Sequence, residues 1–170
     1  MKNVIGLLFF FLFLVNASAQ EKRIDKKLIP EKIKTYLQLN YSLAKGIEYF
    51  KKKDGDALLY EVEFKLNSQE YNLRFSAEGT LVETEREIEL DEIQPSLQQS
   101  IKSALGENFT KIKIRKIQEV DPLGAKQFEV YIKVKKSAKF KAGFYKVMFD
   151  SSGKLLSIEE EKLSSIESVF

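Results

Sequence analysis

An internal repeat is the feature that most limits what this chain can fold into. Three landmarks of the first half return in the same order in the second half: residues 60–64 at 128–132, residues 71–75 at 145–149, and Gly79 at Gly153. Self-similarity of this kind indicates one supersecondary unit that is used more than once. The chain is therefore predicted to hold two copies of one unit, the first over residues 29–90 and the second over 93–163.

Each copy has the pattern of one helix followed by four strands. Pro30 and Pro95 open stretches with apolar residues at helical spacing, and Gly46 and Gly106 are predicted to end the two helices. Runs typical of strands follow in both copies, at residues 47–52, 58–66, 71–75 and 81–88 and then at 111–120, 127–135, 144–149 and 155–160. The predicted fold class is α+β, with two tandem repeats that each pack one helix on a four-stranded antiparallel sheet. The two sheets would either be continuous or lie as packed neighbours.

The beginning of the chain has the pattern of a secretory signal peptide over residues 1–19. Lys2 precedes an apolar run at residues 4–15, and small residues stand at Ala17 and Ala19. The run is about a dozen residues long, whereas a membrane span needs ~20. The mature chain is therefore predicted to begin at Gln20, to be periplasmic or secreted, and to have no membrane span. Residues 20–28, rich in Lys and Arg, are predicted to be a flexible leader.

Composition excludes several kinds of chemistry. The chain has no Cys and no His, so it has no disulfide, no imidazole base, no thiol nucleophile and none of the common zinc sites. The lack of disulfides in an exported chain fits a bacterial periplasm. We therefore assign no catalytic residue, no metal site and no cofactor, and we expect a protein that is not an enzyme.

Three short motifs have simple structural explanations. Ser42 and Lys45 have the spacing of a penicillin-binding Ser-x-x-Lys motif, but the companion Ser-Asp-Asn and Lys-Thr-Gly motifs are absent. Residues 54–56, Asp-Gly-Asp, read as a polar turn between strands rather than a calcium loop. The acidic ladder of Glu85 and its neighbours Glu87 and Glu89 reads as a solvated strand face.

The strand and turn patterns resemble the PepSY-like family of bacterial periplasmic proteins. The second copy carries the resemblance in Phe128-Glu129-Val130 and in Phe149-Asp150-Ser151-Ser152-Gly153, and the first copy in Tyr60-Glu61-Val62. Ser76 stands where the family has Asp, and the Trp that often follows the turn Gly is missing from both copies. The resemblance implies a fold similar to the β-lactamase inhibitor protein and a binding or inhibitory role, with no catalytic residues to carry over. The tandem arrangement looks like that of Bacteroidetes proteins.

Basic residues gather in one part of the second copy. Residues 111–141 hold ten basic and three acidic side chains. Strand alternation places a set of charged, aromatic and Met side chains on the face of the sheet away from the helix; they are Lys113, Arg115, Tyr131, Lys133, Lys146 and Met148. Such anchors ringed by charge are typical of a protein-binding face. The alternative is a face that only keeps the chain soluble.

These observations favour one functional hypothesis over its rivals. The favoured one is a periplasmic, non-enzymatic binding module that grips an acidic protein partner and inhibits or regulates it. The alternative is a carrier or sensor of a small or amphipathic ligand, which a pocket lined by Tyr36, Tyr41, Tyr49 and Phe50 would favour. A hydrolase lacks any recognisable set of catalytic residues. We expect no nucleic-acid partner, because the export signal and the near-neutral net charge both argue against one.

Overall fold

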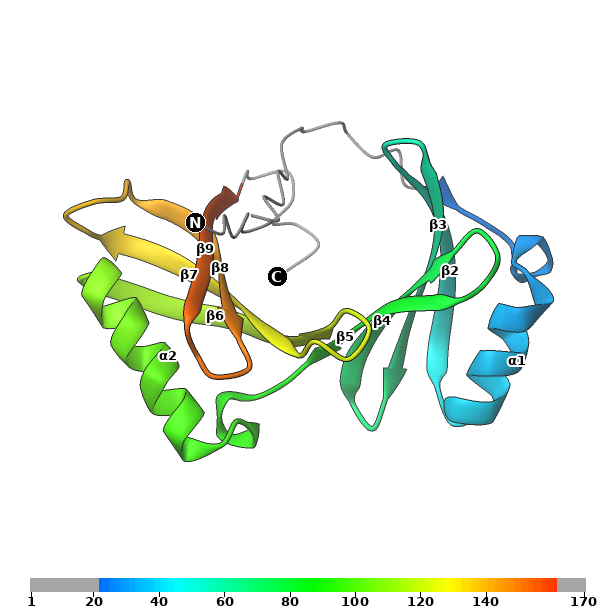
Figure 1. Ribbon diagram of the computed structural model, residues 1–170, viewed down its shortest axis with the longest axis horizontal. Coiled ribbons are helices and arrows are strands. Elements are labelled where there is room, and N and C mark those ends of the chain that lie inside the picture. Colours follow the sequence, from blue (N-terminus) through cyan, green and yellow to red (C-terminus); the bar gives the residue numbers. More distant parts are fainter. Residues whose placement is uncertain (1–21, 162–170) are drawn as a thin grey trace, which may run out of the picture.

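The computed structural model describes residues 22–161, which form one sheet with helices on one side of it (Figure 1). The chain runs through a helix and four strands and then, after a short 3-10 turn, through a second helix and four more strands. In chain order the elements are β1 (Lys22–Arg23), η1 (Lys26–Leu28), α1 (Glu31–Asn40), β2 (Lys45–Asp54), β3 (Ala57–Leu66), β4 (Gln69–Ser76), β5 (Leu81–Glu87), η2 (Leu90–Glu92), α2 (Pro95–Asn108), β6 (Lys111–Asp121), β7 (Gln127–Lys136), β8 (Gly143–Asp150) and β9 (Leu155–Glu161).

The nine strands form a single antiparallel meander in which each strand pairs with the next one along the chain. The two groups of four strands are joined where β5 pairs with β6, from Thr84 opposite Asp121 to Glu87 opposite Gln118. We call this pairing the seam. The sheet is therefore continuous, which resolves the alternative that the sequence left open. In Figure 1 the sheet bends, and α1 and α2 lie outside it at opposite ends.

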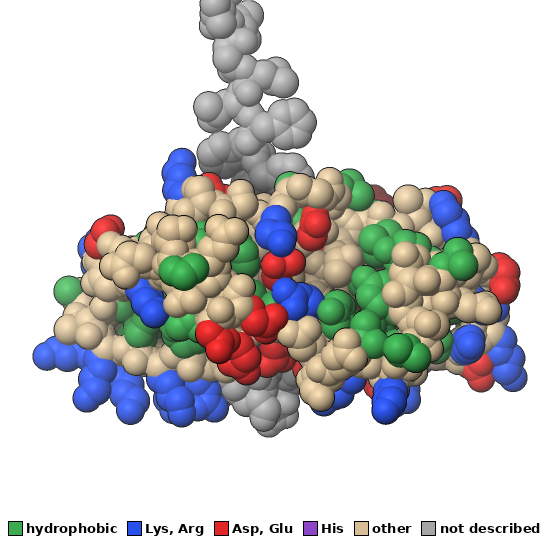
Figure 2. Space-filling view, turned by 90° about the horizontal axis from the view of Figure 1, so that it is seen from below, with side chains coloured by type: hydrophobic (Ala, Val, Ile, Leu, Met, Phe, Trp, Pro, Cys, Tyr) green, Lys and Arg blue, Asp and Glu red, His purple; other side chains and the backbone are tan. Residues whose placement is uncertain are grey.

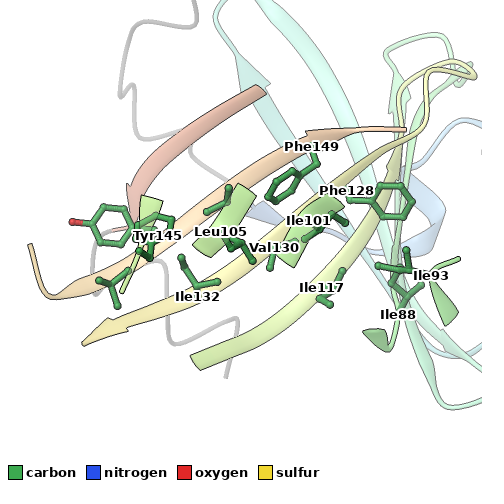
Figure 3. Close-up of a cluster of buried hydrophobic side chains, with 13 residues drawn as sticks. Ile88, Ile93, Ile101, Leu105, Ile117, Phe128, Val130, Ile132, Tyr145 and Phe149 are labelled. Atoms are coloured by element: carbon green, nitrogen blue, oxygen red, sulfur yellow. The ribbon is translucent and has the colours of Figure 1, made fainter. Parts of the chain in front are cut away.

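Each helix buries one apolar stripe against its own half of the sheet. Ile33 and Leu37 of α1 are buried in a core with Phe75 of β4. Ile101 and Leu105 of α2 are buried in a second core, and Figure 3 shows them beside side chains from the neighbouring strands, Val130, Ile132 and Phe149. The alternation of apolar and polar residues in β7 and β8 turns the apolar set toward α2, as the sequence predicts. The opposite face of the sheet is left without a helix among the described residues.

The turns that join β4 to β5 and β8 to β9 have the same geometry. Gly79 N donates to Ser76 O at 2.9 Å, and Gly153 N donates to Asp150 O at 2.9 Å. Both glycines have positive φ, +75° and +84°, and both touch the first turn of the helix in their own half. The hydroxyl of Ser76 accepts from the backbone of the turn, as the carboxylate of Asp150 does in the other half. Ser76 therefore replaces the Asp without loss of the turn.

Gly153→Ala is expected to lower the free energy of unfolding by about 2 kcal/mol, because positive φ strains an L-residue and the site is closely packed. A Cβ there would lie 2.7 Å from Ser100 Cβ and 2.8 Å from Leu97 Cδ1. Gly55→Ala is the control, since φ is +58° but no atom lies within 4 Å. Urea unfolding of both variants measures the change. Equal losses of unfolding free energy in the two variants would show that close packing of Gly153 against α2 adds nothing to the effect.

The ends of both helices differ from the sequence prediction. α1 ends at Asn40, so Gly46 lies in β2, and α2 continues through Gly106 to Asn108. In each helix the last residue is an Asn whose Nδ2 donates to the carbonyl four residues back, at 2.9 Å. The next residue is aromatic and leaves the helix to bury its ring, as Tyr41 does against Phe64. The Asn-aromatic pair, and not glycine, ends these helices.

The predicted flexible leader is also wrong for the part that the structure describes. Lys22 and Arg23 form β1, which pairs with β2, and Ile24 N donates to Tyr49 O at 2.8 Å. Ile24 packs against the first core, and Ile29, the residue after the predicted leader, is 4% exposed and belongs to that core. These apolar residues hold the segment to the edge of the sheet. The predicted signal peptide and Gln20 lie outside the described residues. Within residues 22–161, no helix is long and apolar enough to cross a membrane.

Candidate binding face on the open side of the sheet

The face of the sheet that points away from the helices carries charged and polar side chains from both halves. Strand register places them side by side: Glu61 lies opposite Arg74, and Arg74 lies opposite Glu83. Across the second half, Tyr131 lies opposite Lys146. Residues directly opposite on antiparallel strands share a face of the sheet. We call this surface the open face.

Arg74 is the centre of an ion-pair cluster in the first half. Its Nε donates to Glu61 Oε1 at 2.6 Å, its Nη2 lies 2.8 Å from Glu85 Oε1, and its Nη1 contacts Glu83. Lys52 Nζ lies 3.4 Å from the same Glu61 oxygen. Burial works against the charge of Arg74, but Glu85, Glu83 and Glu61 outweigh it and raise its pKa. Glu61 is 2% exposed, so its carboxylate depends on these two cations.

Glu129 is the centre of a second cluster, in the other half. Tyr131 Oη donates to Glu129 Oε2 at 2.8 Å, and Lys146 Nζ lies 3.5 Å from Glu129 Oε1. Lys146 Nζ also lies 3.7 Å from Glu159 Oε2. Burial and the charge of Glu129 raise the pKa of Tyr131. Burial opposes the charge of Lys146, but Glu129 and Glu159 outweigh it and raise its pKa. Tyr131 therefore stays a neutral donor.

Carboxylates outnumber cations where the two clusters meet. We name the set the carboxylate network; it comprises Glu61, Glu83, Glu85, Glu129 and Glu159 with Lys52, Arg74 and Lys146. Burial raises the pKa of Glu85 to about 7; the ion pair with Arg74 opposes this rise, and Glu129 and Glu83 add to it. The side chain of Glu85 is only 14% exposed. The prediction that Glu85 belongs to a solvated strand face is therefore wrong, because Arg74 holds it against the sheet.

The structure divides the six predicted site residues into two groups. Lys113, Arg115 and Lys133 are exposed, and Lys133 Nζ lies 5.2 Å from the centre of the Phe144 ring. Tyr131, Lys146 and Met148 are half-buried. Lys146 is neutralised by two carboxylates, and the hydroxyl of Tyr131 is already bonded. These residues do share the open face, but they do not make it basic at its centre, because the acidic neighbours come from other strands.

A β-bulge changes which basic side chains reach the open face. The register passes from Ile114 opposite Ile132 to Lys116 opposite Tyr131, so Arg115 is an extra residue between them. Strict alternation would put Lys116 on the helix side. The bulge instead brings Lys116 beside Tyr131, where its Nζ lies 3.7 Å from Glu87 Oε2. The apolar alternation changes phase here, from Ile112 and Ile114 to Ile117. The sequence prediction assumed strict alternation through this point, so Lys116 was missed.

A pocket of about 450 Å³ opens on this face beside the seam. We call it the seam pocket. Residues of both halves line it, among them Glu48, Glu63, Asn72, Glu85, Lys116 and Tyr131. Asn72 Oδ1 is buried and has no hydrogen-bond partner among the described residues. The sequence did not identify this pocket, because its walls come from strands that are far apart along the chain.

The aromatic residues proposed for a ligand pocket serve mainly in the first core. Tyr36 packs edge-on against Phe75 with ring centres 5.5 Å apart, and the ring centres of Tyr41 and Phe64 are 4.9 Å apart. Tyr49 is 8% exposed. None of these three tyrosines lines the seam pocket. These tyrosines therefore do not form the aromatic-lined pocket that would favour a carrier of an amphipathic ligand.

The molecular surface has charges of both signs in separate places. Figure 2, seen from below Figure 1, shows acidic side chains gathered near the middle of the molecule and basic ones at the margins of both halves, with the densest group in the half that carries α2. Four lysines at the outer ends of β6 and β7 are exposed and directly opposed in pairs, Lys111 to Lys136 and Lys113 to Lys133. We call these four residues the basic margin. Like charges opposed across strands destabilise a sheet.

Comparison with known proteins gives the class of fold. No family model matches the chain, and no curated protein matches its sequence. Solved structures do match. One is a DUF2874 family protein from Bacteroides ovatus, with 17% identity, a TM-score of 0.59, and coverage of 78% of this chain and 87% of that one. A protein from Bacteroides eggerthii that is named as periplasmic has 15% identity, a TM-score of 0.60, and coverage of 78% and 88%.

A further match narrows the description of the fold. A BLIP-like protein from Bacteroides fragilis has 15% identity and a TM-score of 0.57, over 78% of this chain and 86% of that one. At these identities the likeness shows the fold alone. The chain therefore has the fold of the BLIP-like proteins, with both helices on one face of a continuous sheet and an open face on the other.

Proposed function

We propose that the mature protein is a non-enzymatic binding module of the bacterial periplasm, which binds a protein partner through the open face. The observation that carries the proposal is the basic margin. Two directly opposed lysine pairs reduce the stability of the sheet, and an acidic partner would relieve their repulsion. The sequence of residues 1–19 and the periplasmic name of one structural neighbour support the location.

We infer that the two halves are PepSY-like copies of one unit, over residues 29–90 and 93–163. Tyr60 lies in β3 and Phe128 in β7, the second of four strands in each half. The two Gly turns and the two Asn-aromatic helix ends support the same alignment. Superposition of residues 30–89 on 95–161 tests it, and Gly79 should fall on Gly153.

The charges of the two copies differ, which supports different roles for the two halves of the open face. The second half presents the basic margin, and the first half presents Glu61 and Arg74 in a closed cluster. Exposed charges at the rim of an interface mainly accelerate encounter. The basic margin would therefore attract the partner, and a BLIP-like fold supports an inhibitory or regulatory outcome of binding.

Lys113→Glu combined with Lys133→Glu is expected to slow association about tenfold at low salt and to weaken its salt dependence, because long-range attraction is lost. Surface plasmon resonance with a partner purified from periplasmic extract measures both rates. The matched control is Lys102→Glu with Lys154→Glu, two exposed lysines that lie away from the open face. Association that is unchanged in the first pair, or equally slowed in the control, would exclude the basic margin.

A further inference from the structure

We propose that the seam pocket receives the guanidinium group of an arginine side chain carried by the protein partner. This inference rests on the proposed function and adds the chemistry of one contact to it. The partner would then present an acidic surface to the basic margin and a projecting arginine to the seam pocket.

The charge of the pocket is the first argument. Four carboxylates line it, those of Glu48, Glu63, Glu70 and Glu85, against the two cations Lys65 and Lys116. Glu85 also belongs to the carboxylate network, in which acidic groups outnumber basic ones. Lys65 pairs with Glu70 at 2.8 Å, and Arg23, outside the pocket, pairs with Glu48 at 2.9 Å. The ammonium group of Lys116 lies 3.7 Å from Glu87, which is not part of the lining. Arg74 is shared among three carboxylates. The cations already present therefore leave the site with an acidic balance, which an incoming cation would relieve.

The seam pocket also contains a hydrogen-bond acceptor that no donor in the described part of the chain reaches. Asn72 Oδ1 is buried and has no hydrogen-bond partner among residues 22–161, while its residue lines the pocket. A buried acceptor without a donor is unfavourable, and such groups are satisfied in most proteins. An entering N–H group would satisfy it. An acidic balance and an unpaired acceptor together favour a ligand that is both cationic and a donor.

Size and geometry decide between kinds of cation. Among residues 22–161 no group of three or more acidic side chains lies close enough to hold a metal ion. The pocket volume of about 450 Å³ is instead within the range of sites for organic groups. A guanidinium group has five N–H donors in one plane and stacks on aromatic rings. It can therefore reach the carboxylate of Glu85 and the amide of Asn72 while its plane lies against Tyr131.

Binding of a cation here would depend on pH. Arg74, Glu129 and Glu83 act on the charge of Glu85. Glu61 shares Arg74 with it, and Lys116 lines the pocket with it. The pKa of Glu85 is about 7, so its carboxylate is more fully ionised at pH 8 than at pH 6. A guanidinium group binds the ionised form better. Affinity should therefore rise severalfold from pH 6 to pH 8.

The test uses the full mature chain and a small probe. Nα-acetyl-arginine methylamide is titrated into labelled protein and followed by NMR, with the neutral isostere Nα-acetyl-citrulline methylamide as the control ligand. We expect a millimolar dissociation constant for the arginine probe, shifts at Asn72, Glu85 and Tyr131, and at least fivefold weaker binding of citrulline. Glu85→Gln should weaken arginine binding about fivefold or more, whereas Glu31→Gln, exposed on α1, should not.

The two proposals fail in different ways. Equal binding of both probes, or arginine binding unchanged in Glu85→Gln, overturns the arginine site and leaves the binding module intact if the purified partner still binds. A second outcome is that arginine binds at the seam pocket, but neither Glu85→Gln nor the basic-margin variant changes association with the partner. This result would overturn the open face as the partner's binding site. Weakening of both probe and partner by Glu85→Gln supports the two proposals together.

Discussion

Arg74→Ala is expected to lower the free energy of unfolding by about 3–5 kcal/mol, the usual loss when one partner of a buried ion pair is removed. Glu61 is 2% exposed and would keep only the contact with Lys52 at 3.4 Å. Glu83 and Glu85 would lose their shared cation as well. Chemical unfolding monitored by circular dichroism measures the change.

Two further variants make this measurement specific to the buried charge. Lys65→Ala removes an exposed ion pair with Glu70, whose side chains are 66% and 51% exposed, and should change stability by less than about 1 kcal/mol. Adding Glu61→Gln to Arg74→Ala removes the stranded carboxylate and should restore part of the lost stability. If the double variant is no more stable than Arg74→Ala alone, the loss comes from packing of the arginine and not from an unpaired charge.

The second large effect is a dependence of stability on pH that is due to Glu85. Folding raises the pKa of this group from 4.5 to about 7, so the folded state binds its proton more tightly than the unfolded state does. Its contribution to stability is complete below about pH 4.5 and is lost as the pH rises through about 7, a change of about 3 kcal/mol. Glu85→Gln should remove this dependence, because an amide does not ionise.

The expected result is clearest as a difference between variant and wild type. At pH 8, Glu85→Gln should be about 3 kcal/mol more stable than the wild type, and at pH 4 the two should be nearly equal. Thermal or urea unfolding at several pH values gives the difference in unfolding free energy between variant and wild type as a function of pH. The contributions of the other titrating groups are the same in both proteins and cancel in this difference. Glu31→Gln, exposed on α1, should give a flat curve. A flat curve for Glu85→Gln as well would mean that Glu85 is ionised in the folded protein across this range.

The sequence predicted the strands and their faces well, because alternation is a local property. In β7 and β8, residues such as Val130 and Val147 point to the helix, and Tyr131 and Lys146 point away, as expected. The helix ends were predicted less well. Gly46 and Gly106 suggested stops, but the backbone leaves each helix at Tyr41 and Phe109, whose rings pack against Phe64 and Phe140. These helix ends depend on tertiary contacts that no short window contains.

The candidate site was harder to predict, because it depends on which strands become neighbours. Glu61 and Arg74 lie opposite each other on the open face. Alternation along a strand gives no sign that Glu61 is buried beneath two cations. The bulge at Arg115 moved Lys116 to this face. Its only sign in the sequence is a change of phase between Ile114 and Ile117, which strict alternation does not take into account. The seam pocket likewise arises only when β5 pairs with β6. Charge composition predicted a basic surface, whereas cross-strand pairing neutralised its centre.

The seam has a mechanical consequence for the open face. Each half has its own hydrophobic core, whereas β5 and β6 share only the four residue pairs between Thr84 and Glu87. We therefore expect the sheet to bend more easily at the seam than within either half, so that the seam acts as a flexure. A small rotation at this flexure would change the angle between the two halves and the span from the basic margin to the carboxylate network. The protein could in this way match its curvature to a partner while both cores stay intact.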